Sequence, residues 1–189
     1  MVETPLRHVA FIRNVMIGRA DLHRDVLLRI FRDAGVTDPR SHLATGNVSF
    51  GWDGASLDGL IDATQVGIAR TIGRFEPVFV RSVTALRTSV QSLPFRSVPI
   101  RDVGHSCVTF TETPAAHLEL PIVSAREDAY IFACDGTDIM SVTRLVEGRG
   151  GNVNRMIEKA LSCAATTRTW HTIERIVTLH EGHDIVSHG

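Results

Sequence analysis

The order of apolar patterns in the N-terminal half constrains the fold more than any other feature of this chain. The run "RHVAFIR" (7–13) is short and apolar, as in a buried strand. Apolar residues then recur at helical spacing over 22–31, and "SHLATGNVSFGW" (41–52) carries the signal of a β-hairpin. A second helical pattern over 57–68 and a strand-like run at 75–81 follow. The order is therefore β-α-β-β-α-β, which predicts a ferredoxin-like half.

The hairpin signal centres on Gly46 and Asn47. A two-residue loop at these positions is of the type II′ kind, because glycine comes first. This register pairs Thr45 with Val48 and places alternate apolar residues on one face of the sheet. Pro77 lacks a backbone N–H, so it favours an edge position for the strand that contains it.

Residues that begin and end helices can also be assigned. We expect Asp21, Ser56 and Ser82 to cap the N-termini of three successive helices. Gly35 and Gly73 supply the stops of the first two, because glycine adopts the left-handed conformation that ends many helices.

The C-terminal half contains similar ingredients. We expect strands at 105–111, 129–134 and 138–144, and helices at 152–162 and 170–179. The fold class is therefore α+β, a ferredoxin-like N-terminal half packed with a second, related α+β half. The expected organisation is a first half at 1–91, a connection at 92–104, a second half at 105–180 and a C-terminal tail at 181–189, or one compact domain overall.

The composition excludes several classes of protein. The 189 residues are 43% hydrophobic and 22% charged, which is typical of a globular protein. No apolar run is long enough to span a membrane, so we expect a cytoplasmic protein. The net charge of −1 gives no general electrostatic attraction to nucleic acid. The three cysteines, which include no C-x-x-C pair, are expected to be buried free thiols.

The strongest candidate site lies at the end of the first strand. In a ferredoxin-like sheet of order 4-1-3-2, that end lies beside the hairpin of strands two and three. We therefore expect Arg13 and Asn14 to meet Thr45 and Asn47, with Gly18 allowing close approach of the backbone. Guanidinium, amide and hydroxyl groups together can hold an anion. Alternatively, the hairpin residues only turn the chain while Arg13 satisfies backbone carbonyls.

The stretch "ATTRTWHTI" (164–172) reads mainly as the start of the last helix. Thr169 is a suitable N-cap, and Trp170 begins an apolar stripe that explains it as a core residue. Neither capping nor core packing explains Arg168, since a cation gains nothing near the N-terminal end of a helix. It pairs with a carboxylate of the protein or binds an anionic ligand, with Trp170 in support.

Four of these segments together resemble a bacterial family, the domain of unknown function family 1697. "AFIRNVMIGR" keeps the family's Arg13 and Gly18, and "ATGNVSF" keeps its Gly46 and Asn47. "FVRS" and "ATTRTWHTI" resemble two further family motifs, so that the resemblance runs from about residue 7 to 179. The chain departs from the family at "GRGG" (148–151), where a lysine is usual. The resemblance implies an α+β fold built from ferredoxin-like parts, with no established activity.

Binding of a small anionic or phosphate-bearing ligand is the leading functional hypothesis. The alternatives are a nucleic-acid-binding module and an enzyme of unknown reaction. The sequence shows no recognisable catalytic motif. No cofactor or metal is expected, because "HEGHD" (180–184) lies in a region where fraying is normal. The sequence does not decide whether the protein is a homodimer. The two candidate interfaces are the strand edge at Pro77 and the apolar run at 118–123.

Overall fold

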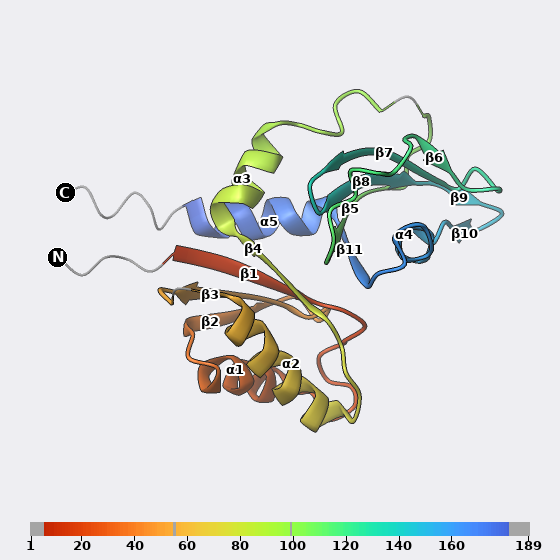
Figure 1. The fold of residues 1–189 in the computed structure, drawn as a ribbon. Helices are drawn as coiled ribbons and strands as arrows, with labels where there is room; N and C mark the ends of the chain where they lie inside the picture. Colours follow the sequence, from red (N-terminus) through yellow and green to blue (C-terminus); the bar gives the residue numbers. More distant parts are fainter. Residues whose placement is uncertain (1–5, 55, 99, 182–189) are drawn as a thin grey trace, which may run out of the picture. The chain divides into compact units, whose positions relative to one another are not determined.

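The computed structural model describes residues 6–54, 56–98 and 100–181. They form an α+β protein with antiparallel sheets (Figure 1). The chain divides into two compact units, Met1–Leu86 and Arg87–Gly189, and the division falls inside one helix. None of the helices within the described ranges has both the length and the apolar character needed to cross a bilayer.

The first unit has the β-α-β-β-α-β order that the sequence predicts. Its elements are β1 (Leu6–Ile12), α1 (Arg24–Asp33), β2 (Thr37–His42), β3 (Asn47–Trp52), α2 (Asp58–Ile72) and β4 (Val78–Ser82). The strands are ordered β2-β3-β1-β4 and all neighbours are antiparallel. The expected order 4-1-3-2 and the edge position of β4 are therefore confirmed.

The core of this unit lies between one face of the sheet and the helices α1 and α2 (Figure 1). Ala10 and Ile12 of β1 share that face with residues of β3 and β4, because side chains alternate along a strand. Leu27, Phe31 and Ile68 pack against them from the helices, and each is at most 1% exposed. The alternating apolar runs of the sequence thus account for the whole layer.

The predicted register of the hairpin is wrong. His42 pairs with Asn47 and Ser41 with Val48, so the loop has four residues, 43–46, and Thr45 pairs with neither strand. Leu43 (φ 59°) and Gly46 (φ 68°) are both left-handed, so the chain reverses through two such residues.

Of the expected helix caps, one is wrong and two are confirmed in part or in full. Helix α1 begins at Arg24 after His23, and Asp21 is a left-handed residue with φ 60°. Ser56 Oγ accepts from the backbone N–H of Asp58, but Leu57 occupies the N-cap position. Ser82 Oγ accepts from the N–H of Ala85 and caps the helix α3 (Val83–Gln91) as expected.

The second unit contains a five-stranded antiparallel sheet of order β11-β5-β8-β7-β6. The predicted strands appear as β5 (His105–Thr111), β7 (Ala129–Asp135) and β8 (Asp138–Thr143), and the predicted helices as α4 (Val153–Leu161) and α5 (Trp170–Glu181). The sequence did not indicate the short strands β6 (Ile122–Val123), β9 (Leu145–Val146) and β10 (Arg149–Gly150), or the edge strand β11 (Ala165–Thr169).

Helix α4 covers part of this sheet. Val153 and Ile157 pack with Ile131, Ile139 and Ala165 in one buried cluster. Asn152 caps the helix, since its side chain accepts from the N–H of Arg155.

Only part of the C-terminal segment discussed from the sequence lies within the described residues. His180 is a buried residue of α5, whereas the expected tail from 182 onward, with His183, lies outside the described residues.

Candidate functional site

The end of β1 lies beside the β2–β3 loop, as predicted. The N–H of Ile12 donates to the carbonyl O of Gly46 (2.9 Å), and Phe11 is the register partner of Asn47. The next segment stays close, because the N–H of Ile17 donates to the carbonyl O of Ala44 (2.8 Å). The backbone relationship on which the candidate site depends is therefore present.

Two glycines shape this junction, and their roles differ from expectation. A Cβ on Gly18 would meet nothing within 4 Å, so Gly18 is needed for its φ of +90° and not for close approach. The close approach is at Gly46, where a Cβ would collide with Cγ2 of Val15 and lie 3.3 Å from Cβ of Ile12.

Asn47 and Thr45 hold the loop together. Asn47 is completely buried, and its Nδ2 donates to the carbonyl O of His42 (3.0 Å) and to Oγ1 of Thr45 (3.1 Å). These bonds fix the loop from inside, so both residues support the backbone beside Ile12.

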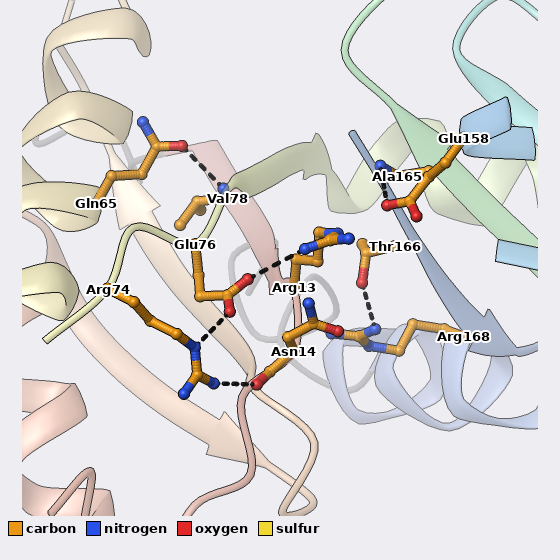
Figure 2. Close-up of polar contacts among 10 residues, drawn as sticks. All are labelled: Arg13, Asn14, Gln65, Arg74, Glu76, Val78, Glu158, Ala165, Thr166 and Arg168. Carbon is orange, nitrogen blue, oxygen red and sulfur yellow. Dashed lines mark hydrogen bonds and ion pairs between the residues drawn. The ribbon is translucent and has the colours of Figure 1, made fainter. Parts of the chain in front are cut away.

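Arg13 faces a carboxylate that the sequence did not single out. Its Nη1 lies 3.5 Å from Oε2 of Glu76, and Arg74 Nε donates to the other oxygen, Oε1, across 2.7 Å. The Glu76 side chain is only 4% exposed, so one buried carboxylate is shared by two arginines (Figure 2). Arg74 Nη2 also donates to the backbone O of Asn14 (3.0 Å), which ties the loop after β1 to the turn before β4.

A second contact fixes that turn from the helical layer. Gln65 of α2 accepts the N–H of Val78 with its side-chain oxygen at 3.0 Å, as Figure 2 shows. The start of β4, and with it Glu76, is thus tied to both the sheet and α2.

A cavity of about 420 Å³ opens on this junction. It is lined by Asn14, Val15, Met16, Arg19, Ala20, Leu22, Ile72 and Arg74. Two of these residues are cationic, and the described residues that line the cavity include no His, Cys, Asp or Glu. Its charge is therefore positive, and it has no group suited to act as a nucleophile or general base.

Several N–H donors of the lining have no hydrogen-bond partner among the described residues. Arg74 uses Nε and Nη2, while its Nη1 makes no hydrogen bond within the described part of the chain. Over the same residues, the Arg19 guanidinium and the side-chain amide of Asn14 have no hydrogen-bond partner, and both residues are exposed. These donors can receive carboxylate or phosphate oxygens.

The sequence interpretation found Asn14 but missed Arg19, Arg74 and Glu76. A signal for two of them was present, because in an antiparallel pair the start of β4 must lie beside the end of β1. Ile12 indeed pairs with Val78, so the segment just before β4 could have been placed next to Arg13. Nothing in the sequence indicates Arg19, since an irregular loop positions it.

Arg168 occupies the second unit and lies within β11, two residues before α5 begins at Trp170. It is 9% exposed, and its Nη1 donates to Oγ1 of Thr166 across 2.7 Å (Figure 2). The same Nη1 also donates to the carbonyl O of Thr167 (2.9 Å). Burial lowers the pKa of its guanidinium to about 10, so it remains charged at neutral pH. Trp170 is buried beside Phe95, with ring centroids 5.0 Å apart, as the predicted core role requires.

Two further kinds of chemically capable group in the described part of the chain are the His42–Ser49 pair and the cysteines. His42 Nε2 lies 2.7 Å from Oγ of Ser49, but Ser49 is completely buried. Among the described residues, no group of three or more His, Cys, Asp or Glu could hold a metal ion. Cys107 is buried as expected, whereas Cys134 and Cys163 are partly exposed.

Comparisons with known proteins place this architecture. The profile of the family described as "Protein of unknown function (DUF1697)" matches residues 6–139. No curated protein matches the sequence. Among solved structures, the chain resembles the conserved bacterial protein SP0830 from Streptococcus pneumoniae, with a TM-score of 0.64 and 15% identity over 94% of this chain and 99% of that one. At this identity, the likeness concerns the fold alone.

Proposed function

The chain belongs to the DUF1697 family, whose description names no activity, and from the geometry of its first unit we propose that it binds a small anionic ligand, bearing a carboxylate or a phosphate. The ligand occupies the cavity between the loop after β1 and the turn before β4. The observation that carries the proposal is a cavity lined by Arg19 and Arg74 with no acidic residue in its lining.

The local charge balance favours an anion. The lining itself carries two positive charges, on Arg19 and Arg74, and the Arg13–Glu76 pair next to Arg74 adds no net charge. Since the Glu76 carboxylate is buried behind the lining, it offsets the charge of Arg13 without occupying the cavity.

Glu76 also orients Arg74. Its short bond to Nε fixes the plane of the guanidinium and leaves Nη1 available for a ligand oxygen. A fixed donor loses less rotational freedom on binding than a free one, so the site is partly preorganised. Arg13, Thr45 and Asn47 act behind the cavity, where they support the loop backbone.

The lack of His, Cys, Asp and Glu among the described lining residues supports binding in preference to catalysis. A general acid or base must reach the reacting group, and the described lining residues offer only guanidinium, amide and apolar groups. We therefore propose a binding protein and assign no reaction.

Titration with inorganic phosphate and with acetate, followed by amide resonances, tests the proposal. We expect saturable shifts confined to the loop of residues 14–22 and to Arg74. Arg19→Ala removes an exposed guanidinium with no described partner, so the fold should be retained while affinity falls about tenfold, as for a lost charge-assisted hydrogen bond.

Arg29→Ala is the matched control. Arg29 is an exposed arginine of α1 in the same unit, and it does not line the cavity. Equal losses of affinity in the two variants would show only general attraction to a cationic surface. That result, or the absence of saturable shifts, would refute the proposed site.

A further inference from the structure

The apolar wall of the cavity carries information about the other end of the ligand. Val15 is 9% exposed and Leu22 is 1% exposed, and both line the cavity while belonging to the core cluster of the first unit. Ile72, the last residue of α2, packs against the same cluster. Because the core holds these side chains in place, this wall is a preformed apolar surface.

The loop side adds an adaptable apolar edge. Met16 lines the cavity and is 43% exposed, and Ala20 lies in the same lining. The methionine side chain is unbranched and polarisable, so it can follow ligands of different outline. Apolar residues therefore make up five of the eight lining positions, and the polar groups are limited to Asn14, Arg19 and Arg74.

A bare inorganic anion does not match this lining. Its oxygens would satisfy the donors of Arg19 and Arg74. The apolar lining that is still accessible, Met16 at 43% exposure and the partly buried Ile72, would stay in contact with water. The cavity, with a volume of about 420 Å³, also has room for more than the oxygens of such an ion.

We propose that the cavity selects amphipathic anions, in which one carboxylate or phosphate group is joined to a hydrocarbon chain or ring. This inference rests on the proposed function and specifies its ligand class. The head group meets Arg19 and Arg74. The hydrocarbon covers the accessible apolar lining, Met16, Ala20 and Ile72, beside the buried Val15 and Leu22. Covering apolar surface adds affinity that a purely ionic ligand does not gain.

A homologous series of ligands tests the inference. Acetate, butyrate and hexanoate share one head group and differ only in hydrocarbon length. We expect affinity to rise about two- to fourfold for each methylene that reaches the wall, the upper figure corresponding to full burial. Inorganic phosphate and butyl phosphate form a second series. The series whose longest member, hexanoate or butyl phosphate, binds more tightly identifies the preferred head group.

Variants of the wall separate this inference from the proposed function. Met16→Ser should weaken binding of hexanoate far more than binding of acetate, because the longer hydrocarbon contacts this residue. Leu145→Ser is the control, since Leu145 is an equally apolar, 69% exposed residue of β9 in the other unit.

Three outcomes would count against these ideas, each in a different way. Equal affinities for acetate and hexanoate, with both reduced by Arg19→Ala, would overturn the amphipathic class and leave anion binding intact. Hexanol bound as tightly as hexanoate would overturn the requirement for an anion. No binding of any member in either series would overturn both.

Discussion

Arg74 Nε donates to Oε1 of Glu76 across 2.7 Å, and the two partners differ sharply in exposure. The Glu76 side chain is 4% exposed and that of Arg74 is 53% exposed. Because Glu76 also faces Arg13, the carboxylate connects the end of β1 to the turn before β4. The orientation of a cavity-lining arginine thus depends on a residue that does not itself line the cavity.

Replacing Glu76 by glutamine should therefore destabilise the first unit. Glutamine keeps the shape of the side chain but replaces one acceptor oxygen by a donor, which faces a guanidinium. We expect a decrease of about 1–3 kcal/mol in the free energy of unfolding, measured by urea denaturation.

Glu127→Gln is the control for that measurement. Glu127 is 74% exposed and lies 3.2 Å from Arg144, so its ion pair is a surface pair and should contribute at most about 1 kcal/mol. Equal effects of the two substitutions would show that the burial of Glu76 adds nothing to the strength of its contacts.

Gly46→Ala should be more harmful than Gly18→Ala. Both glycines have positive φ, so each substitution introduces backbone strain of about 1–3 kcal/mol. Only at Gly46 does the new Cβ also collide with Val15, which must move and thereby deform the cavity wall. Thermal unfolding of both variants, with phosphate titration of each, checks this ranking; a greater loss in Gly18→Ala would contradict it.

The sheet order could be predicted because strands and helices leave apolar patterns in the sequence, and the order of these patterns indicates the ferredoxin-like topology. Residues such as Ala10, Ile12, Val48 and Phe50 alternate along strands that face the helices, and each is fully buried. Strand β11 left no such trace. Its residues are mostly threonines with one arginine, and it lies directly before α5, so the helix signal at Trp170 obscured it.

The candidate site was predicted only in its backbone. Adjacency of β1 to the β2–β3 loop follows from topology, and Ile12 at the end of β1 does bond to Gly46. The Arg13 side chain instead faces Glu76. The side chains that line the cavity depend on the loop after β1, where Asn14, Gly18, Ala20 and Asp21 all have positive φ. No common motif encodes such a path.

His8 should make stability depend on pH. It is 8% exposed and stacks on Phe50, with ring centroids 5.8 Å apart. Burial lowers its pKa below the usual 6.5, outweighing the hydrogen bond to the carbonyl O of Leu6, which raises it. Near and below pH 6.5, the usual pKa, His8 is protonated more in the unfolded chain than in the folded protein. The free energy of unfolding therefore falls as the solution is acidified from about pH 6.5 towards the folded-state pKa.

Urea denaturation at about pH 7.5 and about pH 5.5 measures this effect. The decrease between the two values should be smaller in His8→Gln, because that side chain does not titrate. Identical decreases in the two proteins would assign the pH dependence to other groups.

Cys107 should be the least reactive of the three thiols. Burial raises its pKa to about 11, so at pH 8 only about one molecule in a thousand carries the thiolate that reacts with iodoacetamide. Cys163 is only partly buried, and Oγ1 of Thr113 donates to its sulfur at 3.4 Å. Labelling of the folded protein, followed by mass spectrometry of peptides, should therefore modify Cys163 well before Cys107.

In urea the two thiols should react at similar rates, because the difference arises from the fold. Early modification of Cys107 in the folded protein would mean that β5, which contains it, opens far more readily than its central place between β11 and β8 implies.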